Sequence, residues 1–194
     1  MLLLLAGLGT AAESGASERL AGAAAMDCSA VASATLLHPA PMQAVDARAH
    51  WLDRRRVKWP GHDASGRYRL HHSSTAGLLA EKGRQVSGAD GSVALQLHAA
   101  PLPAALAERF KFVADGVVLA LADADARHLP DLLRRQLMLV QEDGQGRVID
   151  ATLIQAAGAL DDLYAAAGQE TGLGVQVNRT ASTFKLSAPT AARV

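Results

Sequence analysis

The sequence predicts a mainly β fold with short helices, and three observations support this prediction. Small or apolar residues alternate with polar ones between Ala44 and Pro60, which is the period of a half-buried strand. Two further apolar runs, 136–141 and 147–153, flank a loop that contains two glycines, and this is the pattern of a β-hairpin. The helical patterns are short, and glycine or proline lies beside each of them.

The first regular structure in the chain is expected to be a hairpin. Every second residue from Val45 to Trp51 is small or apolar, so this segment is predicted to be a strand with one buried face. A second alternation follows, in which Val57 and Trp59 point to one side and their basic neighbours to the other. Residues 53–55 lie between the two runs and are predicted to form the turn.

Two more strands are predicted before the first helix. Residues 67–72 alternate after a turn over 61–66, and they give the third strand. The glycines of 88–91 favour a turn, and the strand that follows over 92–98 has alternating valine and leucine residues on one face.

The middle of the chain predicts a helix followed by a buried strand. Pro103 is suited to the first turn of the helix, and Gly116 is expected to end it. Its apolar side is formed by Leu106, Phe110 and Val113. The continuously apolar run 117–121 then predicts a short strand.

The remaining elements are a helical turn, a hairpin and a short helix. Residues 130–135 predict the turn, and 136–141 and 147–153 predict the two strands of the hairpin. Residues 158–166 predict the short helix. Two last strands are expected around a turn, in a segment with no further residues to cover them: Val175–Val177 and Thr183–Ser187.

Several of these segments carry a family resemblance. In order and spacing they are similar to the second N-terminal domain of bacterial pullulanases and the related limit dextrinases, starch-debranching enzymes of glycoside hydrolase family 13. The segments that carry it are Val45–Asp53 with Trp59–Gly61, Tyr68–Ser73, Gln136–Val140 with Gly146–Thr152, and Ala159–Ala165. A further similarity, to the first strands of a starch-binding module of carbohydrate-binding module family 48, lies in Leu173–Val175 and Phe184–Ala191.

The resemblance implies a β-sandwich followed by an incomplete second, immunoglobulin-like β-sandwich. The second N-terminal domain is expected over residues 41–167, and a linker with the first strands of a truncated starch-binding module over 168–194. Ser187 stands where that module usually has a tryptophan, so a packing hole is expected there.

Composition limits the classes of partner. Lysine and arginine number 19 and aspartate and glutamate number 19, so the formal net charge is zero and nucleic acid is not an expected partner. Hydrophobic residues make up 49% of the chain but aromatic residues only 4%, so much of the core must come from small aliphatic side chains.

The start of the chain predicts export. Residues 1–12 form an apolar, signal-like segment without a basic front end, and they are too short to span a membrane. Residues 13–40 are rich in alanine, serine and glycine, which predicts a linker that contains Cys28 as an unmodified thiol. A secreted or periplasmic location is therefore expected.

Carboxylate pairs do not form a catalytic constellation in the sequence. Asp161 and Asp162 diverge on a helix, while Asp123 and Asp125 could share the face of a strand, and solvated or capping roles are favoured for all four. A calcium loop that starts at Asp123 fails, because its sixth position is His128 and its twelfth is Arg134.

Histidines, basic residues and aromatic rings each allow a functional reading and a structural one. His71 and His72 must point to opposite faces of a strand, and a zinc site from His50, His62 or His98 is a minor alternative. A solvated face is favoured over an anion site for the basic run Arg54, Arg55, Arg56 and Lys58. Burial in the core is favoured over a sugar-stacking platform for Trp51, Trp59 and Tyr68.

The sequence therefore assigns no catalytic, cofactor-binding or metal-binding residue and no cofactor. The resemblance implies the non-catalytic N-terminal portion of an α-1,6-glucosidase, whose catalytic (β/α)8 barrel needs roughly 250 residues or more. The expected partners are an α-glucan and the catalytic domain of the same protein. The alternative is an α-glucan-binding module that acts alone.

Overall fold

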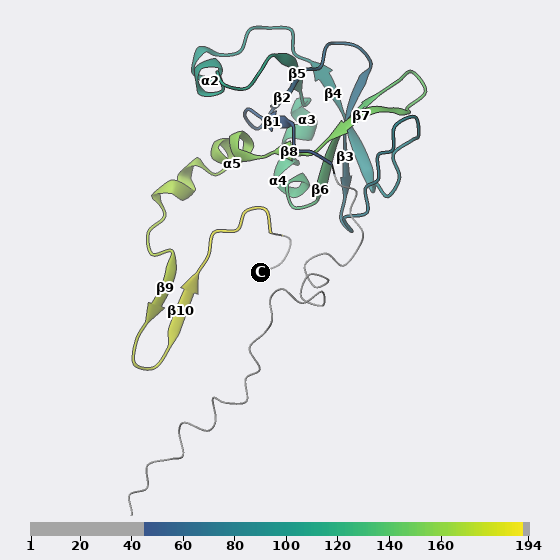
Figure 1. Cartoon of the computed structure of the whole chain (residues 1–194). Helices are drawn as coiled ribbons and strands as arrows, with labels where there is room; N and C mark the ends of the chain where they lie inside the picture. Colours follow the sequence, from purple (N-terminus) through teal and green to yellow (C-terminus); the bar gives the residue numbers. More distant parts are fainter. Residues whose placement is uncertain (1–44, 192–194) are drawn as a thin grey trace, which may run out of the picture. The chain divides into compact units, whose positions relative to one another are not determined.

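The computed structural model describes residues 45–191 (Figure 1). The predicted signal-like segment 1–12, the linker 13–40 and Cys28 lie outside the described residues. Within the described range, no helix is long and apolar enough to cross a membrane.

The predicted mainly β fold is confirmed, and it consists of a large sheet and a small one. The large sheet has eight strands in the order β7-β6-β3-β4-β5-β2-β1-β8. Its strands are β1 (Ala49–Trp51), β2 (Arg56–Pro60), β3 (Arg67–Ser73), β4 (Gly91–Leu97), β5 (Gly116–Ala120), β6 (Gln136–Glu142), β7 (Val148–Thr152) and β8 (Ile154–Gln155). The small sheet contains β9 (Gly174–Val177) and β10 (Ser182–Lys185).

Strand β4 joins the two halves of the large sheet, which are β7, β6 and β3 on one side and β5, β2, β1 and β8 on the other. Residues 91–95 of β4 pair with β3, and the last two residues of β4, Gln96 and Leu97, pair with β5. All neighbouring strands are antiparallel except β1 and β8. The two halves share one hydrophobic core, so the arrangement matches the expected sandwich.

The chain itself nearly closes the sheet. The edge strand β7 ends at Thr152, and β8, at the opposite edge, starts at Ile154. Thr152 is fully buried, and its hydroxyl donates to the carbonyl oxygen of Asp46 at 2.7 Å and accepts from the amide of Arg48 at 2.8 Å. This buried hydroxyl connects the residues before β1 to the end of β7, beside a backbone hydrogen bond of 2.9 Å from the Leu153 amide to the Asp46 carbonyl oxygen.

Two clusters of buried side chains hold the strands together. The main core is formed by β1 to β6 together with residues of the segment 121–133 and Ala159. Its largest fully buried members include Trp51, Trp59, Leu70, Leu119, Leu129 and Leu139. A second cluster lies on the other face of β6, where the segment 78–86 covers it: Leu78, Ala80, Met138, Val140, Val148 and Ala151. Both faces of β6 are therefore buried, in agreement with its apolar sequence.

The helices are short, as expected. They are α2 (Ala104–Arg109), α3 (Asp123–Ala126), α4 (Leu129–Leu132), α5 (Ala157–Leu163) and the 3₁₀ helix η1 (Ala165–Gln169). No residue of α2 is buried, whereas Gly158 and Ala159 of α5 are buried. The start of α5 therefore packs more closely on the sheet than α2 does.

Three predicted details are wrong. The first strand spans Ala49–Trp51 only, because the residues before it bond through Thr152 instead of joining a strand ladder. Helix α2 ends at Arg109, and Gly116 begins β5; a Cβ at Gly116 would lie 2.1 Å from the carbonyl oxygen of Trp59, so close strand approach accounts for this glycine.

The third correction concerns Asp123 and Asp125. They lie on α3 and not on a strand, and both are in its first turn, where the helix dipole favours negative charge. The two-residue strand β8 was not predicted either, because so short a segment carries no period of its own.

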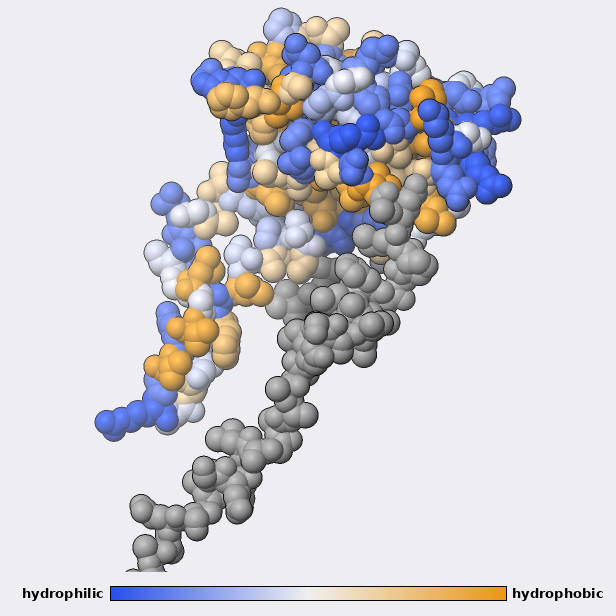
Figure 2. Space-filling model, in the orientation of Figure 1, coloured by the Kyte–Doolittle hydropathy of each residue, from blue (hydrophilic) through white to orange (hydrophobic). Residues whose placement is uncertain are grey.

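The β9–β10 hairpin is exposed along its whole length. Val175 pairs with Phe184 and Val177 with Ser182, so one face of the hairpin is apolar. Figure 2 shows hydrophobic residues along this hairpin. The boundaries between the predicted domains 41–167 and 168–194 stay predictions.

Candidate functional site

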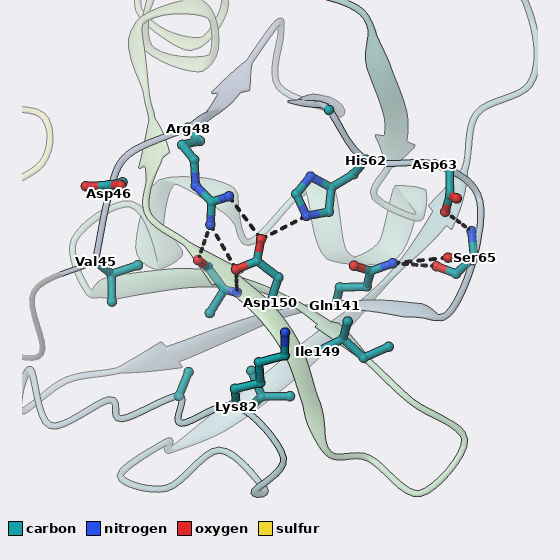
Figure 3. Close-up of a pocket in the computed structure, with 14 residues that line it drawn as sticks. Val45, Asp46, Arg48, His62, Asp63, Ser65, Lys82, Gln141, Ile149 and Asp150 are labelled. Carbon is teal, nitrogen blue, oxygen red and sulfur yellow. Dashed lines mark hydrogen bonds and ion pairs between the residues drawn. The ribbon is translucent and has the colours of Figure 1, made fainter.

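A polar hollow of about 910 Å³ lies beside the edge strand β7. It is lined by the residues before β1, the turn after β2, the loop around Lys82 and the outer side of β7 (Figure 3). Hydrogen-bonding side chains make up most of its named lining: Asp46, Arg48, His62, Asp63, Ser65, Lys82, Gln141 and Asp150. The hollow is within the size range of ligand pockets.

Arg48 and Asp150 form the centre of the hollow. The guanidinium nitrogens Nη1 and Nη2 of Arg48 each donate to one oxygen of Asp150 at 2.9 Å, and Nη2 also donates to the carbonyl oxygen of Ala151 at 2.9 Å. Nε2 of His62 lies 3.0 Å from the second oxygen of Asp150. This bidentate pair joins residues that are 102 positions apart in the chain.

The environment of Asp150 keeps its carboxylate ionised. Burial acts to raise its pKa, but hydrogen bonds from Arg48, the Ala151 amide and His62 outweigh burial and hold the pKa below its usual value. A glycosidase acid needs the opposite, a carboxyl group whose pKa is raised so that it keeps a proton. Asp150 is therefore suited to positioning Arg48 and His62, and not to acid catalysis.

Aromatic rings of the core contact residues that line the hollow. The ring of His62 stacks on Trp59 with centroids 3.9 Å apart, and Tyr68 meets Trp59 edge-on at 6.0 Å. The hydroxyl of Tyr68 donates to the carbonyl oxygen of Asp63 at 2.6 Å. Burial, with a contribution from the Asp63 charge, raises the pKa of Tyr68 to about 12, so this hydroxyl keeps its proton.

The prediction that the three aromatic residues are buried is confirmed. Trp51 and Trp59 are 1% and 0% exposed, and Tyr68 is also buried. None of them can offer a ring face to a sugar from solvent. Trp59 nevertheless contributes to the hollow, because it fixes the ring of His62.

Each member of the basic run has an acidic partner. The ion pairs are Arg54–Asp162, Arg55–Asp123, Arg56–Asp53 and Lys58–Asp115. These partners neutralise the charge that an anion would need, and the structure thus favours the expected surface role.

The adjacent carboxylates of α5 diverge as expected, but both make ion pairs. Asp161 pairs with Arg109, and Asp162 pairs with Arg54. Asp162 also accepts a hydrogen bond from the Arg54 backbone amide at 3.0 Å. They therefore attach α5 to other segments, a role that sequence spacing alone did not indicate.

The histidines within the described residues do not form a metal-binding cluster. Nε2 of His71 bonds Glu142 at 2.8 Å in a buried pair, while Nδ1 of His72 lies 3.3 Å from Arg135. Burial, and then the charge of Lys58, lowers the pKa of His50. No group of three or more histidine, cysteine, aspartate or glutamate side chains with metal-binding geometry occurs within residues 45–191.

A comparison with protein families decides the assignment of the chain. The family model described as the pullulanase N2 domain matches residues 46–162. The chain belongs to this family. The matched range includes all eight strands of the large sheet and every lining residue of the hollow except Val45.

Similar proteins agree with the assignment. The N2 chain is 29% identical over 148 residues to a pullulanase of Klebsiella pneumoniae and 31% identical over 150 residues to the chloroplastic pullulanase 1 of Arabidopsis thaliana. It covers 13% and 15% of those proteins, and 76% of its own length is aligned in each. A crystal structure of the K. pneumoniae pullulanase complexed with maltotriose superposes with a TM-score of 0.63 at 29% identity, over 78% of this chain and 14% of that one.

Sequence reasoning considered His62 but missed the rest of the hollow. Arg48 and Asp150 lie on predicted strands as ordinary polar residues, and no local spacing indicates that they meet. A weak signal was present for both residues, because Arg48 lies in the family-like segment 45–53 and Asp150 in the family-like segment 146–152. The side chains of Gln141 and Lys82 carried no signal of their own.

Proposed function

We propose that this chain is a non-catalytic N-terminal portion of a pullulanase-type α-1,6-glucosidase and that it supports the substrate face of the catalytic domain. The match of residues 46–162 to the pullulanase N2 domain carries the proposal. The lowered pKa of Asp150 agrees with it, because this carboxyl group does not keep the proton that a glycosidase acid needs.

The proposed partners are an α-glucan and the catalytic domain. The similar K. pneumoniae pullulanase was crystallised with maltotriose, an α-glucan fragment. The polar hollow and the many paired surface charges suit contact with neutral, hydrated molecules better than contact with nucleic acid.

An assay of reducing ends separates this proposal from an enzymatic role. The purified chain is incubated with pullulan, and the release of reducing sugar is followed against an active pullulanase. We expect no release above the blank. Release that persists after further purification would contradict the non-catalytic assignment. Retardation of the chain in a native gel that contains pullulan would favour the alternative of a glucan-binding module that acts alone.

We also propose that the protein is secreted or periplasmic, on the basis of the apolar residues 1–12. A fusion of residues 1–40 to alkaline phosphatase, which is active only after export, tests the proposal. Phosphatase activity in intact cells is the expected result. If the fusion is active only after a known signal sequence has been added to it, the proposal is contradicted.

A further inference from the structure

The hollow beside β7 is lined by side chains that have hydrogen-bond donors and acceptors left over after their contacts with described residues. Asp150 is saturated, because its two oxygens accept from Arg48, His62 and the Ala151 amide. Arg48, in contrast, has further N–H groups beyond those that bond Asp150 and Ala151. Donors are therefore left over at the centre of the site.

Lys82 adds a second free donor. Its side chain lines the hollow and points toward Asp150 in Figure 3, and it makes no ion pair or hydrogen bond within the described range 45–191. The neighbouring charges Glu81 and Arg84 pair with each other instead. The ammonium group of Lys82 is thus available to a ligand.

Acceptors are left over as well. The amide nitrogen of Gln141 donates to the carbonyl oxygen of Ser65 at 2.9 Å, while its amide oxygen accepts no hydrogen bond from any described residue. The carboxylate of Asp46 also accepts none from the described part of the chain. The spare donors and acceptors come from different elements and line the same hollow.

The balance of charge indicates the kind of ligand. Arg48 and Lys82 are positive and Asp46, Asp63 and Asp150 are negative, so neither a strong anion nor a strong cation is favoured. A hydroxyl group both donates and accepts hydrogen bonds, so a neutral ligand with many hydroxyls can use both sets of groups. Ile149, which is 38% exposed, supplies an apolar contact at the same place.

We propose that this hollow is a sugar-binding site that takes an α-glucan. The choice of an α-glucan among hydroxyl-rich ligands rests on the proposed function. Arg48, Lys82 and Gln141 hydrogen-bond the sugar hydroxyls, and Ile149 contacts the apolar face of a sugar ring. Asp150 and His62 act as positioning residues that hold Arg48 in place.

Titration of the isotope-labelled full chain with maltotriose, followed by two-dimensional NMR, tests the proposal. We expect saturable shifts in the amides of residues 46–48, 61–65, 82 and 148–151. Lys82→Ala should weaken the apparent Kd at least about fivefold, as loss of a charged hydrogen-bond donor does. Lys82→Arg should recover part of the loss.

Lys111→Ala is the matched control, because Lys111 is an exposed lysine that does not line the hollow. Its Kd should equal that of the unchanged chain. No saturable shift, shifts confined to other residues, or equal Kd values for Lys82→Ala and the unchanged chain would overturn the site. Equal affinity for the β-linked cellotriose would overturn the assignment to α-glucan. None of these results affects the non-catalytic role, which the pullulan assay tests separately.

Discussion

Single side chains fasten segments that are far apart in the chain, and Asp162 of α5 is the clearest case. Nε and Nη2 of Arg54, in the turn after β1, donate to its two carboxylate oxygens at 2.8 and 2.9 Å. These side-chain hydrogen bonds lower the pKa of Asp162 to about 2, against the smaller opposing effect of burial. The contact ties the first hairpin to the last helix of the domain.

The lowered pKa of Asp162 predicts an acid-sensitive contribution to stability. Because the folded-state pKa lies below the ordinary value of 3.8, the stabilisation is fully present above about pH 4 and is lost as the pH falls toward about 2. The pair is partly exposed, so solvent screens it. Asp162→Asn should therefore lower the free energy of unfolding by about 1 kcal/mol near neutral pH and by almost nothing near pH 2. Chemical denaturation across this pH range measures the difference.

Asp161→Asn is the control for that prediction, because Asp161 is adjacent but pairs with Arg109 through an exposed contact. Asp161→Asn should lower the free energy of unfolding by less than Asp162→Asn does. A cost for Asp162→Asn that is the same at pH 2 and pH 7 would show that the Arg54 contact does not carry the stabilisation.

Close strand approach predicts a second effect at the scale of a residue. A Cβ at Gly116 would lie 2.1 Å from the carbonyl oxygen of Trp59, whereas a Cβ at Gly144 would meet nothing within 4 Å. Gly116→Ala should therefore separate β5 from β2 and lower the unfolding free energy by about 1–3 kcal/mol, the usual cost of overpacking. Gly144→Ala should change it little. Thermal unfolding of both variants is the measurement, and equal melting temperatures would contradict the prediction.

At the scale of elements, Thr152 is one of the contacts that connect β7 to the residues before β1, beside the Arg48–Asp150 pair. Thr152→Val keeps the shape of the side chain but removes the hydroxyl, so the Arg48 amide loses this partner, while the Asp46 carbonyl keeps only its hydrogen bond from the Leu153 amide. A loss of about 1–3 kcal/mol in unfolding free energy is expected for the lost hydrogen bonds. Thr152→Ser keeps the hydroxyl and should lose less unfolding free energy than Thr152→Val. Equal losses for the two variants would mean that packing, and not hydrogen bonding, connects the sheet edges.

The two sheets should also differ in the stability of their hydrogen bonds. Among the strands that the structure describes, β9 and β10 pair only with each other, and all their residues are exposed. An isolated two-stranded hairpin is marginal in water. Amide hydrogen exchange should therefore be much faster in 174–185 than in β3, which lies between β4 and β6. Comparable protection in both places would contradict this expectation.

Local patterns accounted for most elements but not for the contacts between them. The alternation in β2 and β3 and the glycine loop between β6 and β7 gave strands in the correct places, because burial of one face imposes a period of two residues. Gly116 was misread as a helix end, because the need for glycine arises from Trp59 on another strand. The hollow was missed for the same reason, since Arg48 and Asp150 meet only after the sheet has formed.

At the scale of the whole molecule, we propose that the chain supports a catalytic domain. The domain matched to the pullulanase N2 family has its own core and a nearly closed sheet, so it can be moved between related proteins as one unit. Its relation to a catalytic domain can therefore be measured in a similar pullulanase of known structure.

The most direct test replaces the N2 domain of the Klebsiella pneumoniae pullulanase with residues 46–162 of this chain and compares pullulan hydrolysis with that of an N2 deletion. We expect the chimera to hydrolyse pullulan at least about tenfold faster than the deletion, which corresponds to about 1.4 kcal/mol in activation free energy. A folded chimera that is no faster than the deletion would contradict the supporting role.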